Sequence, residues 1–224
     1  MGQEPNDKQI SNLPEGLPDR VYEAERVLQK RLAEAEKRHE DLLVNFIILY
    51  GGVGRLDLST VYLERLLQLA NDAEKKANCF LMLGQTMEQT GNYEEAIQFY
   101  KQALVLEPTD SDVWYLVNNN LGYCLNYFSK YADAEPYCRE AIKLDPGRYN
   151  AYKNLGISLQ GLGTYTMAAR SFIKAVEAEP RDNRAFRHLL ELMSAHPEIA
   201  VDIPDIHQEV ERCRKLVQNA GFST

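Results

Sequence analysis

Three kinds of residue recur in step along this sequence and constrain its fold more than any other feature. Glycine, alanine and proline each return after 38 and then after 34 residues. The three series are Gly84, Gly122 and Gly156; Ala96, Ala134 and Ala168; Pro108, Pro146 and Pro180. A repeat of this length cannot bury its apolar side alone, so neighbouring units must stack into a solenoid with a long groove.

Each repeating unit reads as two helices joined by a turn. The glycine sits in the first helix, where it accepts a helix-propensity cost of about 1 kcal/mol and lets a neighbouring helix approach. The alanine lies on an apolar face of the second helix that continues one turn later. The proline ends that helix because it cannot donate a backbone hydrogen bond. The residues one turn after the alanines are Tyr100, Cys138 and Phe172.

This arrangement closely resembles the tetratricopeptide repeat family. Its three clear units occupy residues 77–110, 111–148 and 149–182. The resemblance implies an all-α fold, a right-handed α-solenoid of helix-turn-helix repeats with capping helices. In that fold the first helix of each unit lines the concave side.

A short turn joins the two helices of each unit. Glycine tolerates positive φ in such a turn, and asparagine or serine bonds locally to the backbone. The aromatic residue that ends each turn is expected to fill the space between the two helices. The turns are Gly91-Asn92-Tyr93, Ser129-Lys130-Tyr131 and Gly163-Thr164-Tyr165.

A degenerate unit is predicted at residues 40–76, before the three clear ones. Gly54 stands at its turn, Ser59 at the small contact and Leu63 at the large one, while Ile47 replaces the glycine of the first helix.

The 111–148 unit has four extra residues, about one helical turn, so its first helix should start early. Trp114 then lies either near the mouth of the groove or in the core between repeats.

Both ends of the chain are predicted to cap the solenoid. Residues 183–196 form a capping helix, and 197–224 a linker and an amphipathic helix whose apolar stripe is either a lid on the last repeat or a partner-binding face. That stripe consists of Ile206, Val210, Cys213 and Val217.

At the start, residues 1–18 are expected to be disordered. Residues 19–39 form the first part of a long helix that continues to Tyr50. Heptad spacing joins Val21, Leu28, Ala35 and Leu42. Glu25 and His39 interrupt the seam, which favours a capping helix over a coiled coil. The expected state is therefore a monomer or at most a weak dimer.

Composition narrows the class of partner. The formal net charge of -8 repels nucleic acid, and no segment of the 224 residues is long and apolar enough to span a membrane. The four cysteines lack paired spacing and are interpreted as buried, reduced thiols of a cytoplasmic protein.

No catalytic or metal chemistry can be assembled from the sequence. The segment from Gly51 to Arg55 is glycine-rich but lacks the lysine and hydroxyl residue of a phosphate loop, and the four histidines form no zinc motif. The chain is therefore predicted not to be an enzyme and to bind no cofactor or metal.

The resemblance places candidate binding residues along the concave groove. They grade from a mixed and apolar start through an asparagine and tyrosine centre to a basic end. They are Gln85, Asn119, Asn120, Tyr123, Tyr127, Lys153, Asn154, Ile157, Arg184, Arg187 and His188.

These residues suit a protein or peptide ligand. Asn120 and Asn154 occupy equivalent places, which resembles the asparagine ladder that some family members use to bond an extended peptide backbone. Tyr123 and Tyr127 form either a side-chain pocket or a packing contact with the next unit. The family's carboxylate clamp is only partly matched, so a chaperone tail is a doubtful ligand. An acidic side chain or free C-terminus facing Lys153, Arg184 and Arg187 fits the basic end.

The predicted function is a non-enzymatic protein–protein interaction module or scaffold that binds an extended segment of a partner in the concave groove. The alternative is a structural or oligomerisation subunit that uses its terminal helices.

Overall fold

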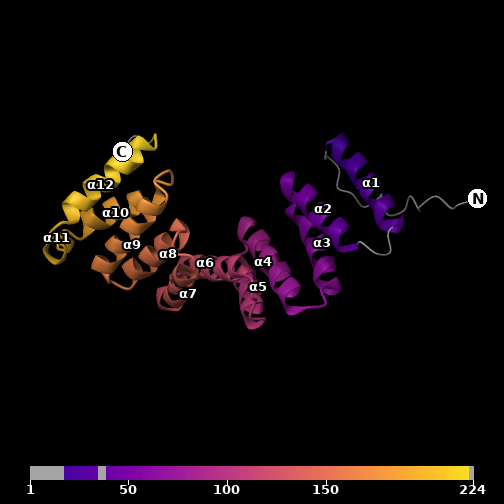
Figure 1. Cartoon of the computed structure of the whole chain (residues 1–224), viewed down its shortest axis with the longest axis horizontal. Coiled ribbons are helices and arrows are strands. Elements are labelled where there is room, and N and C mark those ends of the chain that lie inside the picture. Colours follow the sequence, from indigo (N-terminus) through magenta and orange to yellow (C-terminus); the bar gives the residue numbers. More distant parts are fainter. Residues whose placement is uncertain (1–17, 35–38, 222–224) are drawn as a thin grey trace, which may run out of the picture.

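The computed structural model describes residues 18–34 and 39–221, and within these ranges the regular structure is entirely helical (Figure 1). The predicted all-α class is confirmed, whereas the disorder predicted for 1–18 falls almost wholly outside the described residues. The helices are α1 (Asp19–Glu34), α2 (His39–Gly52), α3 (Leu56–Leu69), α4 (Ala73–Gln89), α5 (Tyr93–Val105), α6 (Ser111–Tyr127), α7 (Tyr131–Leu144), α8 (Tyr149–Gly161), α9 (Tyr165–Ala178), α10 (Arg184–Ala195), α11 (Ile199–Asp202) and α12 (Ile206–Asn219).

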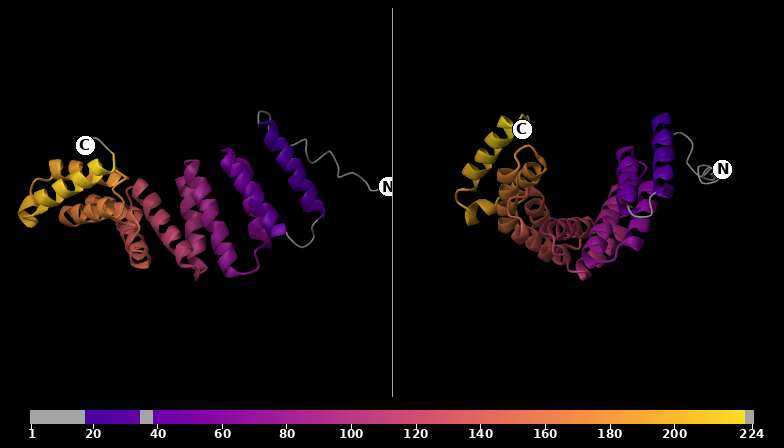
Figure 2. Two further views of the ribbon diagram at one scale, coloured as in Figure 1. Left: turned by 45° about the horizontal axis from the view of Figure 1, so that its top comes forward. Right: turned by 45° about the vertical axis from the view of Figure 1, so that its right-hand side comes forward.

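Four helix pairs stack into a curved solenoid (Figure 2). Within each pair the helices pack closely, α2 with α3, α4 with α5, α6 with α7 and α8 with α9. The first helices of consecutive pairs also touch, α4 with α6 and α6 with α8, more extensively than the second helices touch one another. The first helices therefore line the concave side.

The repeated glycines mark the closest approach within each pair, as predicted. A Cβ added to Gly84 would lie 2.4 Å from the ring of Tyr100, and one added to Gly156 would lie 2.5 Å from the ring of Phe172. In the middle unit, a Cβ on Gly122 would lie 2.6 Å from the sulfur of Cys138. All three contacts are too short for a real side chain, so glycine is required there for packing.

The first pair keeps this geometry with different volumes. Ile47 stands at the glycine place of α2, and Leu63 stands opposite it on α3. Both side chains are buried in one core cluster, and the hydroxyl of Ser59 donates to the backbone oxygen of Ile47 at 3.4 Å. A larger residue on one helix and a smaller one on the other fill the same space. The degenerate unit is therefore a genuine helix pair.

The turns have the predicted backbone, and their aromatic residues reach beyond their own unit. Residue Ser129 adopts φ of +57°, in the left-handed region that glycine occupies in the other units. Tyr93 and Tyr165 pack on core clusters that include residues of their own helix pairs, and they also contact the next unit. Tyr93 stacks on Tyr127 with ring centroids 4.1 Å apart, and Tyr165 stacks on His196 at 3.4 Å. These aromatics join successive units.

The extra turn of the second clear unit is present. The carboxylate of Asp110 caps α6 by accepting from the backbone nitrogens of Asp112 and Val113, and Trp114 lies half-buried inside the helix. The helix α4 is equally long and begins at Ala73, four residues before the predicted start of its unit. Its cap is Asp72, which accepts from the backbone nitrogen of Lys75 at 2.7 Å.

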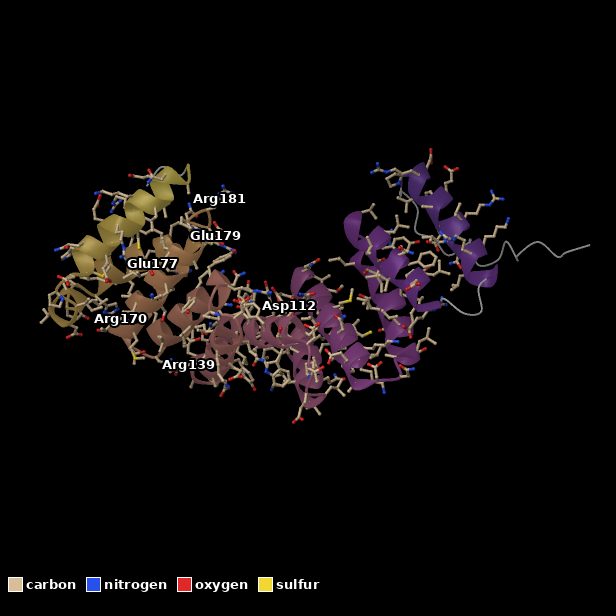
Figure 3. The ribbon with its side chains drawn as sticks, in the orientation of Figure 1. Asp112, Arg139, Arg170, Glu177, Glu179 and Arg181 are labelled. Atoms are coloured by element: carbon tan, nitrogen blue, oxygen red, sulfur yellow. The ribbon has the colours of Figure 1, made fainter. Side chains whose placement is uncertain are left out.

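The last helix covers the end of the solenoid. The side chains of Ile206, Cys213 and Val217 are fully buried against α9 and α10. Arg212 of α12 donates to Glu177 of α9, one of the residues labelled in Figure 3. This apolar stripe is a lid, and its surface is occupied by the chain itself.

The prediction of one long helix from Asp19 to Tyr50 is wrong. The tyrosine hydroxyl of Tyr50 donates to the carboxylate of Glu25, although 25 residues of continuous helix would separate these groups by about 37 Å. The chain therefore reverses, and α1 packs beside α2 with Val21 in the core. Glu25 is buried, since Tyr62 also donates to it at 3.0 Å. Ala35 of the heptad series lies outside the described residues.

Two further features concern the whole described chain. None of the helices in residues 18–34 and 39–221 is both long and apolar enough to cross a membrane. All four cysteines are buried and free, as predicted. Burial raises the pKa of the Cys124 and Cys138 thiols to about 12.

Candidate functional site

The candidate residues come from three first helices, α4, α6 and α8, and from the capping helix α10, on the concave side of the solenoid. The convex side is formed by second helices, where Arg139 of α7 and Arg170 of α9 lie along the outer edge (Figure 3). The inner surface differs from this outer one because several of its polar side chains are buried.

The asparagines of α6 and α8 form one buried network. The amide nitrogen of Asn154 donates to the side-chain and backbone oxygens of Asn119 at 3.0 and 3.3 Å. The amide of Asn126 donates to the backbone oxygen of Asn154 at 2.8 Å, and the hydroxyl of Ser158 donates to Asn126 at 2.8 Å. Asn154 is only 2% exposed. The network therefore joins two repeats and holds the floor of the concave face.

One atom of this network has no partner. The side-chain oxygen Oδ1 of Asn154 is buried, and the described residues offer it no hydrogen bond. A buried polar atom without a partner costs about 1–3 kcal/mol. Asn154 thus combines a donor that is engaged with α6 and an acceptor that remains unsatisfied.

Asn120 belongs to a second set of bonds that reaches back to the preceding unit. Its amide nitrogen is 3.4 Å from the hydroxyl of Tyr100, which donates to the carboxylate of Glu88 at 2.9 Å. Burial raises the pKa of Glu88, while this hydrogen bond and the charge of Lys153 act in the opposite direction. Glu88 is on α4 and Lys153 is on α8, so their charges interact across α6.

Lys153 is the most unusual charged group of the site. The residue is only 7% exposed, and its ammonium nitrogen lies 6.0 Å from the centre of the Tyr149 ring. Burial lowers the pKa of Lys153, and the nearby charge of Arg184 lowers it further, whereas Asp182 and Glu88 act in the opposite direction. Among the described residues, no carboxylate oxygen lies within 4.0 Å of the Lys153 ammonium nitrogen, the limit for an ion pair.

Arg184 has a carboxylate of its own. Its Nε donates to both oxygens of Asp182 at 2.8 and 2.9 Å, and one terminal nitrogen donates to the hydroxyl of Tyr149 at 3.3 Å. The Arg184 guanidinium holds the pKa of Asp182 well below its usual range. Asp182 therefore neutralises Arg184, whereas Lys153 is a buried candidate cation for which the described residues supply no ion pair.

His188 and Arg187 extend the same basic end on α10. The His188 ring stacks on Phe172 with centroids 5.4 Å apart, and burial lowers its pKa. Arg187 is exposed. The structure therefore brings Lys153, Arg184 and His188 together.

The two tyrosines pack against the preceding unit. The Tyr93 ring of α5 stacks on Tyr127 and meets Tyr123 edge-on at 6.1 Å. Burial raises the pKa of Tyr123 to about 12, while Tyr127 remains 59% exposed. The two rings therefore contact the preceding repeat and not the next one, and a side-chain pocket at these tyrosines stays a prediction.

The remaining candidates, Gln85 on α4 and Ile157 on α8, are half-buried. Sequence reasoning did not select Glu88, Asn126 or Ser158 for this site. The spacing of Glu88 and Asn126 from the repeat glycines predicts that they face the concave side. It does not predict the hydrogen bonds that they make. Within the described ranges, no group of three or more His, Cys, Asp or Glu residues is placed to hold a metal ion.

Two parts of the chain match models of the tetratricopeptide repeat, over residues 40–105 and 116–148. The chain contains tetratricopeptide repeats. The first match starts at the second residue of α2 and so includes the unit in which Ile47 replaces glycine. The family resemblance of the sequence is confirmed.

These tetratricopeptide repeats occur in much longer relatives. The chain is 25% identical over 151 residues to human protein O-mannosyl-transferase TMTC1, covering 67% of this chain and 16% of the relative. It is 29% identical over 125 residues to the peroxisomal targeting signal receptor of Eremothecium gossypii, covering 55% and 21% respectively. The aligned region spans about a fifth or less of these curated relatives.

Solved tetratricopeptide-repeat structures share the fold over nearly their full length. MamA, residues 41 to the end, from Desulfovibrio magneticus RS-1 has a TM-score of 0.66 at 18% identity, covering 84% of this chain and all 100% of the other. YrrB has a TM-score of 0.60 at 22% identity, covering 86% and 96%. The solenoid architecture is therefore established, and the low identities leave the ligand open.

Proposed function

We propose that this tetratricopeptide-repeat chain is a non-enzymatic interaction module that holds an extended segment of a partner protein against its concave face. One observation carries the proposal. Lys153 is a largely buried cation on that face without a carboxylate in ion-pair range among the described residues. A buried charge is costly unless it is paired, so a carboxylate of the partner would complete this site.

The unsatisfied oxygen of Asn154 supports a peptide as the source of that carboxylate. It is the residue next to Lys153, and its carbonyl lacks a donor. A backbone N–H of an extended segment would supply such a donor, while the amide nitrogen of Asn154 keeps its bonds to Asn119. Together the two residues match an acidic side chain or C-terminal carboxylate with an adjacent backbone amide.

The comparisons support the same class of function. The Eremothecium gossypii relative is by name a targeting-signal receptor, and YrrB is described as having an unusual peptide-binding site. TMTC1 is named as a transferase, but only 16% of it is aligned. The proposal therefore includes a cytoplasmic, non-enzymatic protein that is a monomer or weak dimer. Its proposed partner is a protein and not nucleic acid.

The assembly alternative lacks a comparable observation. The stripe on α12 is buried in the chain itself, and Val21 of α1 is buried against the first helix pair. The terminal helices thus use these apolar residues for capping, whereas the cation on the concave face remains unpaired.

Selection from a display library of random twelve-residue peptides tests the proposal. Peptides selected on the wild-type chain should carry an acidic residue or a free C-terminal carboxylate. Lys153→Gln should weaken their binding about tenfold or more, because a charge-assisted hydrogen bond in a buried site is lost. The matched control is Lys174→Gln, which changes an exposed lysine on α9. Equal binding by wild type and Lys153→Gln would refute the proposal.

The pH dependence of binding gives a second readout. Lys153 binds a carboxylate only when protonated, and burial lowers its pKa from 10.5. Binding of the selected peptides should therefore weaken with rising pH sooner than an exposed lysine would require. Lys153→Gln should remove this dependence.

A further inference from the structure

We propose that the bound segment has two unlike ends: an apolar side chain flanked by a basic residue at the α2–α4 end, and an acidic group at Lys153. This inference rests on the proposed function and adds to it the class, order and spacing of the ligand residues. It comes from a second feature in the N-terminal half of the solenoid, a cleft whose lining includes the first helices α2 and α4.

A cleft of about 290 Å³ lies between α2, α3 and α4. Most of its lining is apolar, and Asn78 adds one amide. The apolar residues are Val44, Leu66, Ala70, Cys79 and Met82. Pockets that enclose whole small molecules start at about 300 Å³, so this volume suits one or two side chains of a longer ligand. Val44 is 37% exposed at the opening.

The apolar surface continues from the cleft along the inner helix. Ile48 follows Val44 by one turn of α2 and is 65% exposed. An isolated exposed isoleucine is ordinary, but here it borders an apolar cleft on the same helix face. A leucine, methionine or phenylalanine side chain that enters the cleft would cover both residues.

The rim of the cleft is acidic. Glu40 and Asp41 contribute two carboxylates, and Lys75 pairs with Glu40 at 2.8 Å. One net negative charge therefore remains at this rim, whereas Lys153 leaves a positive charge at the other end of the groove. A ligand with a basic residue beside its apolar one is attracted to the rim in one orientation only.

The distance between the two ends sets the spacing in the ligand. The cleft lies between α2 and α4, and Lys153 lies on α8. Adjacent packed helices are about 8–10 Å apart, so the path across α4, α6 and α8 measures about 20–25 Å. An extended chain covers about 3.3 Å per residue, which places the apolar and acidic residues about six to eight positions apart.

The display library used for Lys153 tests this inference separately. Peptides whose binding requires Lys153 should also carry an apolar residue about six to eight positions from the acidic one. Val44→Lys should weaken them about tenfold or more, because a buried leucine-sized side chain is left in water. The control, Val105→Lys, makes the same change at a residue of α5 that is 82% exposed. It should leave binding within about twofold of wild type.

A charge reversal at the rim gives an independent measurement. Asp41 is exposed, so Asp41→Lys should leave folding intact and shift the selected peptides from a basic to an acidic residue beside the apolar one. If peptides require Lys153 but bind Val44→Lys normally and keep the same residues on Asp41→Lys, this inference is wrong and the proposed function stands. Peptides that do not require Lys153 refute both.

Discussion

Replacing Gly122 and Cys138 by alanine, singly and together, tests the register on which the whole fold rests. A Cβ on residue 122 would lie 2.6 Å from the sulfur of Cys138, whereas packed non-bonded atoms stay about 3.5–4.0 Å apart. The backbone oxygen of Ala134 and nitrogen of Cys138 are each 3.5 Å from the same point. The added methyl group therefore cannot fit unless Cys138 or the helix backbone around it moves.

The magnitudes of the two single changes follow from this contact. Gly122→Ala should cost about 1–3 kcal/mol through overpacking, partly offset by about 1 kcal/mol of helix propensity. Cys138→Ala should cost about 1 kcal/mol, similar to removal of one buried methyl group. In the double variant the new methyl group fills the space that the sulfur leaves, so both costs disappear. The propensity gain cancels in the double-mutant cycle, so a coupling energy of about 2–4 kcal/mol measures the contact itself.

Urea unfolding followed by circular dichroism measures all four free energies. Gly51→Ala is the matched control, because that helical glycine has no atom within 4 Å of its added Cβ. It should raise stability by up to about 1 kcal/mol. The reasoning is refuted if Gly122→Ala and Cys138→Ala add to within about 0.5 kcal/mol, because independent sites behave in that way.

Three further predictions concern other groups. Burial raises the pKa of the Cys138 thiol from 9.0 to about 12. The stability that this thiol contributes should therefore be complete below about pH 9 and decrease as the pH rises toward 12. In Cys138→Ala the urea midpoint should fall less over this pH range than in the wild type. Ser129→Gly should raise the free energy of unfolding by about 0.5–1 kcal/mol, since a left-handed non-glycine residue is strained, whereas Ser129→Ala should give no gain. Glu25→Ala should leave the hydroxyls of Tyr50 and Tyr62 without their acceptor and speed hydrogen exchange in α1, and unchanged protection would contradict this role.

The repeat register could be predicted from the sequence because its determinants are local and periodic. Glycine followed 16 residues later by a large side chain identifies two helices that touch, and Tyr100, Cys138 and Phe172 each meet the expected glycine. The degenerate unit keeps this spacing too. Ile47 stands at the glycine position and Leu63 stands 16 residues later, and both are buried in one core cluster. Periodicity therefore determined the helix pairs and their order.

The N-terminal helix could not be predicted in the same way. Apolar residues at heptad spacing describe α1 and α2 equally well as one helix or two, because periodicity does not mark a reversal of the chain. In the sequence Glu25 interrupts the apolar seam, yet in the structure Tyr50 and Tyr62 both donate hydrogen bonds to its buried carboxylate. That compensation depends on residues 25 and 37 positions away, which no local pattern reveals.

The inner surface shows the same limit for the candidate site. Repeat position identified which residues face inward, but it could not tell a residue that meets a ligand from one that joins two repeats. Asn119 and Asn154 look like free binding residues, yet the amide nitrogen of Asn154 bonds to Asn119 and leaves only its own oxygen without a partner. Arg184 looks like a free cation and instead pairs with Asp182. Only the three-dimensional arrangement shows which polar groups remain without a partner.

This distinction determines how substitutions in the groove should be interpreted. Asn154 holds α8 to α6 through its donor, so its replacement disturbs the surface on which any peptide would lie. Lost binding in an Asn154 variant therefore has a structural explanation that requires no ligand contact. Lys153 makes no such bond to the described chain, and removing a buried charge should not weaken the fold. The cation without a partner, and not the asparagine pair, is the residue whose loss separates binding from stability.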